Sequence, residues 1–205
     1  MSLARLIAVV LSHLWVVSWT VATAGLMFPS SANAATEVKR YRAWDAAGDP
    51  IVPEFTERRG DCNSSSFVNP RSDAWRCFVG RRIYDPCFEN PVYDREVICV
   101  ASPWVRSGVV VRSRLDPSDR YPIRGFRAWA LRLENGRGCV FVSGASGVVK
   151  GRRLNYVCRL RRFGLAGPPF LFGSPDRSRA TWTILKANDY LGRKWRRVRI
   201  LAAWR

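Results

Sequence analysis

Histidine is almost missing from this chain of 205 residues, and its one copy, His13, lies in the apolar N-terminal stretch. From Ala35 onwards the sequence contains no histidine. That absence excludes Ser-His-Asp and Cys-His nucleophilic mechanisms and histidine metal ligands from this part of the chain. We therefore expect no metal site, no small-molecule cofactor and no catalytic residue of these kinds.

The sequence from Ala35 onwards also lacks a convincing helical periodicity, an internal repeat and a low-complexity tract. It contains short alternating segments separated by turn residues at intervals of about ten residues. The clearest of these expected strands are 74–79, 96–101, 107–113, 127–133, 139–143, 154–160, 181–186 and 194–205. This pattern predicts a mainly β protein, built as one compact antiparallel sandwich or barrel-like domain.

Two segments show no such alternation. Residues 35–60 are polar and contain two prolines, which favours a linker before a domain that spans 61–205. Residues 164–176 contain three glycines and three prolines. We expect a long loop there, and long loops inside compact domains are often functional.

Residues 1–34 have the pattern of a secretory signal. Arg5 is the only charged residue, an apolar run follows, and Ala32-Asn33-Ala34 provides the small residues of a cleavage site. We expect cleavage near Ala34 and a protein that is secreted or associated with the cell envelope. The alternative is a retained membrane anchor, since about 20 apolar residues can span a bilayer.

All six cysteines follow this predicted signal, at positions 62, 77, 87, 99, 139 and 158. An even number of cysteines in an exported chain is typical of disulfides. None is arranged as C-x-x-C, which argues against zinc. Six cysteines allow 15 pairings, of which we expect the local one: Cys62–Cys77, Cys87–Cys99 and Cys139–Cys158.

The positive charge is concentrated in one part of the chain. Lys and Arg number 34 against 16 Asp and Glu, and 95–205 holds 24 of the basic and 6 of the acidic residues. Such a field attracts polyanions. The expected anion-binding residues are Arg152, Arg153, Arg159, Arg161, Arg162, Arg196, Arg197 and Arg199. The alternative is a solvated basic surface without a specific ligand.

The tryptophans between these arginines suit a phosphate-bearing chain, because guanidinium groups pair with phosphate and rings stack or anchor at an interface. We expect an anionic cell-wall polymer or a lipid surface as the partner. No helix-turn-helix or aromatic RNA motif occurs, so sequence-specific nucleic-acid recognition is not expected. Aromatic residues are also dense around the first four cysteines, where we favour a core role over a stacking platform for sugars or bases.

Two other functions remain open. Carboxylates around 73–96, above all Asp73 and Asp85, suggest a hydrolase of envelope glycans if a pair shares one cleft. The alternative is that they occupy turns or pair with nearby arginines. A secreted cationic toxin or inhibitor is the third possibility, and it requires residues 194–205 to act as a free amphipathic helix. We favour a non-enzymatic binding or accessory protein.

A resemblance supports the exported setting. The runs RSDAWRC (71–77), IYDPCF (83–88) and VIC (97–99), with GRRLNYVC (151–158), resemble a family of small exported proteins from high-GC Gram-positive bacteria. The resemblance covers most of the chain after the signal and implies a cell-envelope setting but no activity. At Arg81 the chain departs from the asparagine that often follows the turn glycine in that family.

Overall fold

The computed structural model describes residues 34–115, 127–160, 166–189 and 194–205, which belong to one compact unit that runs from Asn33 to Arg205. The predicted signal peptide lies outside these ranges, as do Arg161 and Arg162. Every regular element in the described ranges is a strand, so the mainly β class is confirmed. In these ranges there is no helix able to cross a membrane.

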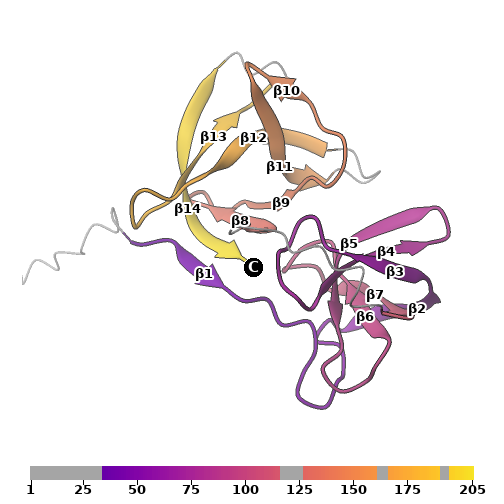
Figure 1. Cartoon of the computed structure of the whole chain (residues 1–205). Helices are drawn as coiled ribbons and strands as arrows, with labels where there is room; N and C mark the ends of the chain where they lie inside the picture. Colours follow the sequence, from indigo (N-terminus) through magenta and orange to yellow (C-terminus); the bar gives the residue numbers. More distant parts are fainter. Residues whose placement is uncertain (1–33, 116–126, 161–165, 190–193) are drawn as a thin grey trace, which may run out of the picture. The chain divides into compact units, whose positions relative to one another are not determined.

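A closed antiparallel barrel occupies the C-terminal half of this unit (Figure 1). Its strands, in ring order, are β8 (Ala130–Leu133), β9 (Gly138–Phe141), β11 (Arg152–Leu160), β12 (Ala166–Asp176), β13 (Thr183–Ala187) and β14 (Trp195–Trp204). Pairing of β14 with β8 closes the ring. Two short strands are added to the barrel sheet. β1 (Glu37–Lys39) pairs in parallel with β14, and β10 (Val148–Val149) pairs with β11.

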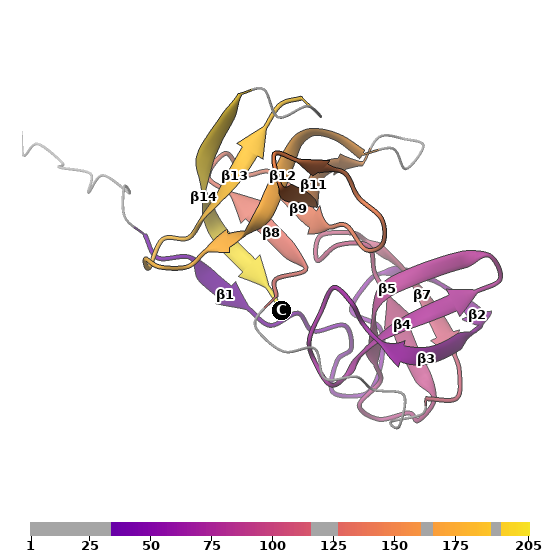
Figure 2. The ribbon, with the colours of Figure 1, turned by 45° about the horizontal axis from the view of Figure 1, so that its top comes forward.

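The second sheet comes from the N-terminal half and has the order β2-β7-β6-β5-β4-β3 (Figure 2). Its strands are β2 (Glu54–Arg59), β3 (Asp61–Ser65), β4 (Ala74–Val79), β5 (Arg82–Glu89), β6 (Glu96–Cys99) and β7 (Ser107–Arg112). Only Gly60 separates β2, which pairs with β7, from β3, which pairs with β4. One run of chain therefore joins both edges, and the sheet curls back on itself.

In both sheets, the alternation of apolar and polar residues along a strand predicts which side chains are buried. In β4, Trp75 and Cys77 are buried while Phe78 is exposed on the opposite face. In β14, Val198 and Ile200 are buried between exposed arginines, so the tail is a strand within the sheet. The cationic toxin hypothesis required this tail to be a free helix, and it is not carried further.

The expected loop at 164–176 is wrong, because residues 166–176 form β12. Phe170, Leu171 and Phe172 are all buried. They contact two different clusters of core residues, with Leu171 in one and the phenylalanines in the other. A strand that is buried on both faces has no alternation of apolar and polar residues, which is why the pattern was missed.

The segment 35–60, expected as a polar linker, contributes β1 and β2 to the two sheets. It also buries Trp44, whose indole Nε1 donates a hydrogen bond to the carbonyl oxygen of Phe88 at 2.9 Å. The first sheet residues thus begin close to the predicted cleavage site. A chain that starts at Ala35 retains every strand that the structure describes.

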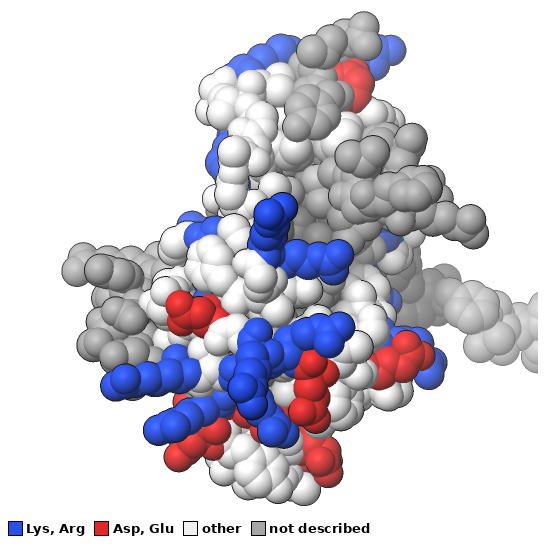
Figure 3. Space-filling view, turned by 90° about the vertical axis from the view of Figure 1, so that its right-hand side faces the viewer, with Lys and Arg blue, Asp and Glu red and all other residues white. Residues whose placement is uncertain are grey.

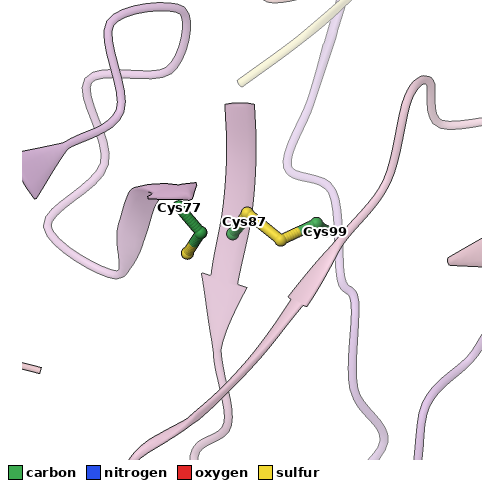
Figure 4. A group of neighbouring side chains, drawn as sticks. All are labelled: Cys77, Cys87 and Cys99. Carbon is green, nitrogen blue, oxygen red and sulfur yellow. A yellow bond between two sulfur atoms is a disulfide. The ribbon is translucent and has the colours of Figure 1, made fainter. Parts of the chain in front are cut away.

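The three local disulfides are confirmed: Cys62–Cys77, Cys87–Cys99 and Cys139–Cys158. The sulfur atoms of Cys77, Cys87 and Cys99 lie within 4.8 Å of one another on adjacent strands (Figure 4). Because no cysteine is free, this cluster offers no thiolate to a metal. Three disulfides are compatible with an extracellular protein.

Candidate functional site

A pocket of about 540 Å³ opens at one end of the barrel. It lies where β8 begins, β9 ends, β11 begins and β12 ends, and barrel mouths are common ligand sites. The lining residues are Phe67, Arg127, Ala128, Phe141, Ser143, Gly144, Arg153, Asn155, Tyr156, Ser174, Pro175 and Arg177. Its size falls in the range of small-molecule sites.

Arg153 is fixed in this pocket by acceptors from two segments. Its guanidinium donates to Oδ1 of Asn155 at 2.7 Å, and to the carbonyl oxygens of Val142 at 3.0 Å and Gly144 at 2.7 Å. All three acceptors are neutral, so they orient the group without cancelling its charge. A guanidinium has five N–H donors, which leaves donors that no other described residue accepts.

The guanidinium group of Arg127 packs against the ring of Phe141, as does that of Arg153. Its guanidinium carbon is 5.1 Å from the centroid of Phe141, and that of Arg153 is 5.4 Å away. Arg127 also donates to the carbonyl oxygen of Phe67, a residue of the second sheet's β3–β4 connection. The ring of Phe141 is therefore in contact with two guanidinium groups, and a bound anion would reduce their mutual repulsion.

Tyr156 forms the buried base of the pocket. Its hydroxyl donates to the carbonyl oxygen of Ala128 at 2.7 Å, and its ring meets Phe141 edge-on with centroids 5.3 Å apart. Burial raises the pKa of Tyr156, while the charge of Arg127 opposes that shift. The hydroxyl therefore stays protonated and neutral at physiological pH.

The third cation is Arg177, which is exposed at the rim and lies 5.7 Å from the ring of Trp182. Among the described lining residues there are three arginines and no Asp or Glu. A concave site with guanidinium groups and no carboxylates favours an anionic ligand, since each guanidinium group can form two parallel hydrogen bonds with a phosphate or carboxylate group.

Among the expected anion-binding residues whose side chains the structure describes, only Arg153 lines this pocket. Arg197 and Arg199 form ion pairs instead, with Asp176 at 2.9 Å and Glu134 at 2.8 Å. Arg152 and Arg196 are exposed outside the pocket lining. The side chain of Arg159 and the whole of Arg161 and Arg162 lie outside the described residues.

Arg127 was missed because it stands apart from the basic runs in the sequence, whereas Arg177 belongs to a short basic cluster with Arg179 but was not among the expected anion-binding residues. Arg127 precedes β8 and Arg177 follows β12, so only closure of the barrel brings them to Arg153. Isolated arginines near aromatic residues carry little signal of their own. Phe67 gave no signal either, because it joins the pocket from the other sheet.

The carboxylates suggested for glycan hydrolysis do not share a cleft. Asp73 accepts from Nε of Arg71 at 2.7 Å and lies 3.7 Å from Arg40. Asp85 lines a second pocket of about 390 Å³, in which it is the only Asp or Glu among the described lining residues. Asp73 and Asp85 thus do not form the kind of acid–base pair that glycoside hydrolysis requires.

Asp85 is nevertheless chemically distinct. It accepts hydrogen bonds from the hydroxyl of Ser66 and, at 3.0 Å, from the backbone N–H of Phe67. Burial raises the pKa of Asp85 to about 6, although these hydrogen bonds and the charge of Arg76 oppose the shift. The carboxyl group therefore fixes the start of the segment that carries Phe67 to the mouth of the barrel.

The charge of the surface is mixed around the second sheet. Figure 3 shows basic side chains next to acidic ones in the lower part of the view, where this sheet lies. Such mixing agrees with the near neutrality of residues 35–94, which carry 9 basic and 10 acidic residues. General attraction of polyanions is weaker there than at the barrel.

Comparisons with protein-family models, with curated proteins and with solved structures gave no match. Fold and site together define an all-β, disulfide-linked protein with a cationic and aromatic pocket at the mouth of a six-stranded barrel.

Proposed function

We propose that this is an exported, non-enzymatic binding or accessory protein of the cell envelope, which holds an anionic group of a wall polymer in the barrel-mouth pocket. The observation that carries the proposal is the convergence of Arg127, Arg153 and Arg177 without a carboxylate among the described lining residues. The predicted signal peptide and the disulfides support the exported setting.

A polymer is favoured over a lipid surface because the guanidinium groups line a concavity. A pocket of about 540 Å³ encloses a single charged group with its neighbouring sugar-sized unit. A membrane surface is instead recognised by basic side chains on a flat or convex face, often with an amphipathic helix. The tail that would have supplied such a helix is strand β14.

The experiment is a salt titration of residues 35–205 binding to purified wall polymer, to anionic vesicles and to duplex DNA. Nonspecific binding by counterion release falls steeply with salt for all three. We expect the wall polymer to remain bound at salt concentrations that release the vesicles and the DNA. Retention of the vesicles alone would identify a lipid surface instead and overturn the polymer proposal.

Substitutions of the pocket arginines test whether the polymer binds in the pocket. Loss of a charged hydrogen bond costs about 1.5–3 kcal/mol, so Arg177→Gln is expected to lower polymer affinity about tenfold or more. Arg127→Gln with Arg153→Gln is expected to abolish salt-resistant binding. The control is Arg58→Gln with Arg59→Gln, which removes two exposed charges from β2. If the control weakens binding as much as the pocket variants do, the pocket is not the site.

A further inference from the structure

The anion pocket continues onto an exposed face of the second sheet through Phe67. This residue lines the pocket, yet 47% of its surface remains exposed. The guanidinium carbon of Arg76 lies 4.6 Å from the centroid of its ring and 5.4 Å from the centroid of Phe78. Phe67, Arg76 and Phe78 therefore form a continuous row, which we call the stacking row.

The row lies on the outer face of β4. Arg76 and Phe78 are two residues apart, so they share a face, while Trp75 and Cys77 point into the core. Across the hairpin, Ile83 pairs with Phe78 and is 51% exposed. Large apolar side chains on an exposed sheet face cost solvation, so a row of them beside a pocket indicates a contact surface.

The cation in the row packs between two rings. Nε of Arg76 is buried without a hydrogen-bond partner, although the charge of Arg76 also acts on the carboxyl group of Asp85 and opposes the rise of its pKa. Arg76 thus places a positive charge between Phe67 and Phe78. An alternation of ring, cation and ring matches a chain in which flat apolar units alternate with anionic groups.

We infer that the stacking row is the continuation of the binding site, and that the ligand is a chain of sugar units linked by phosphate groups. The inference rests on the proposed function. One phosphate occupies the pocket between Arg127, Arg153 and Arg177. The sugars that follow stack on Phe67 and Phe78, with the next phosphate at Arg76. The spacing of Arg76 and Phe78 along β4, about 7 Å, suits consecutive units of such a chain.

The test compares ligands of different length by calorimetry. The probes are inorganic phosphate, size-fractionated fragments of a purified phosphate-linked wall glycan, and inorganic polyphosphate as a chain without sugars. We expect affinity for the glycan to rise with fragment length. Phe78→Ala is expected to remove about fivefold of the affinity for long fragments, since an aromatic contact is worth about 1 kcal/mol. It should leave binding of inorganic phosphate and of polyphosphate unchanged.

Phe55→Ala is the matched control, because Phe55 is a similarly exposed phenylalanine on β2. If Phe78→Ala and Phe55→Ala bind long fragments alike, or if affinity does not rise with length, the stacking row is not part of the site. The pocket and the proposed function would survive that result. If neither phosphate nor any fragment binds, the proposed function fails and the extension fails with it.

Discussion

At the scale of single residues, Asp85 connects the second sheet to the pocket. Its carboxylate accepts from Ser66 and from the N–H of Phe67, and the carbonyl oxygen of Phe67 accepts from Arg127. Ser66 in turn accepts from the N–H groups of Val68 and Asn69, which shapes the turn that presents Phe67. The position of one pocket wall therefore depends on a half-buried acid outside the pocket.

The raised pKa of Asp85 predicts a specific dependence of stability on pH. In the folded protein its pKa is about 6, against 3.8 for an unperturbed carboxyl. The folded state therefore binds the proton more tightly. The stabilising contribution is fully present below pH 4 and is lost as pH rises through 6, a change of about 3 kcal/mol. Chemical denaturation measures this change. We expect the free energy of unfolding of wild type, relative to that of Asp85→Asn, to fall by this amount between about pH 3 and pH 7.

The comparison with Asp85→Asn cancels the titration of all other groups, including Glu96, whose pKa is also raised by burial. A difference that stays constant across this range would mean that Asp85 titrates as in the unfolded chain. Its burial would then be compensated by the two hydrogen bonds, and the segment around Phe67 would be insensitive to pH.

The sequence predicted some site chemistry but not the site itself. Arginine and aromatic residues were expected to bind an anion, and Arg153 lies in the pocket. Arg197 and Arg199 were expected to do the same, but strand pairing and the β8–β9 turn bring them beside Asp176 and Glu134. Which arginines are neutralised depends on long-range contacts, and no local pattern encodes those.

At the scale of elements, the β8–β9 hairpin shows how closely the barrel packs. Its turn contains Asn135-Gly136, as expected for a hairpin, and β9 begins at Gly138. A Cβ atom on Gly138 would lie 1.9 Å from the ring of Trp104. That ring stacks on Trp204 of β14 with centroids 5.1 Å apart. The glycine is required for the hairpin to contact this tryptophan pair.

Gly138→Ala is therefore expected to destabilise the protein by about 2–3 kcal/mol, since overpacking forces a rigid ring out of its position. Gly136→Ala in the same hairpin is the control: it has φ of 76° but no atom within 4 Å of an added Cβ. It should cost only the left-handed strain of about 1 kcal/mol. Urea unfolding measures both, and equal losses would mean that Trp104 moves aside freely.

Strand prediction succeeded or failed according to burial. β4 and β14 have one buried and one exposed face, and both were predicted from alternation. β12 is buried on both faces at residues 170–172 and contains glycine and proline at a shift in its register with β13, so its sequence looks like a loop. The parallel pairings of β1 with β14 and of β2 with β7 join segments that are far apart in the sequence, which a local pattern does not reveal.

At the scale of the whole molecule, repulsion between positive charges opposes the compact fold. The chain carries a formal net charge of +18, and self-repulsion of this kind destabilises a compact state. The three disulfides and the closed barrel resist that repulsion. An anion that binds only to the folded protein would add stability through its binding free energy.

This reasoning predicts that sulfate raises the melting temperature of residues 35–205 more than chloride does at equal ionic strength. Both salts screen the net charge, but we expect sulfate also to occupy the pocket. At tenfold above its dissociation constant, sulfate adds about 1.4 kcal/mol, or about 4 °C for a chain of this length. Sulfate also stabilises proteins in general, through exclusion from their surface.

The pocket variant with Arg127→Gln and Arg153→Gln separates the two effects. It keeps the general stabilisation and should lose the additional 4 °C or so that binding contributes. The variant with Arg58→Gln and Arg59→Gln removes the same charge from β2 and should keep that gain. A sulfate effect that is equal in all three proteins would assign the stabilisation to screening and exclusion alone. The guanidinium groups at the barrel mouth would then bind no free anion.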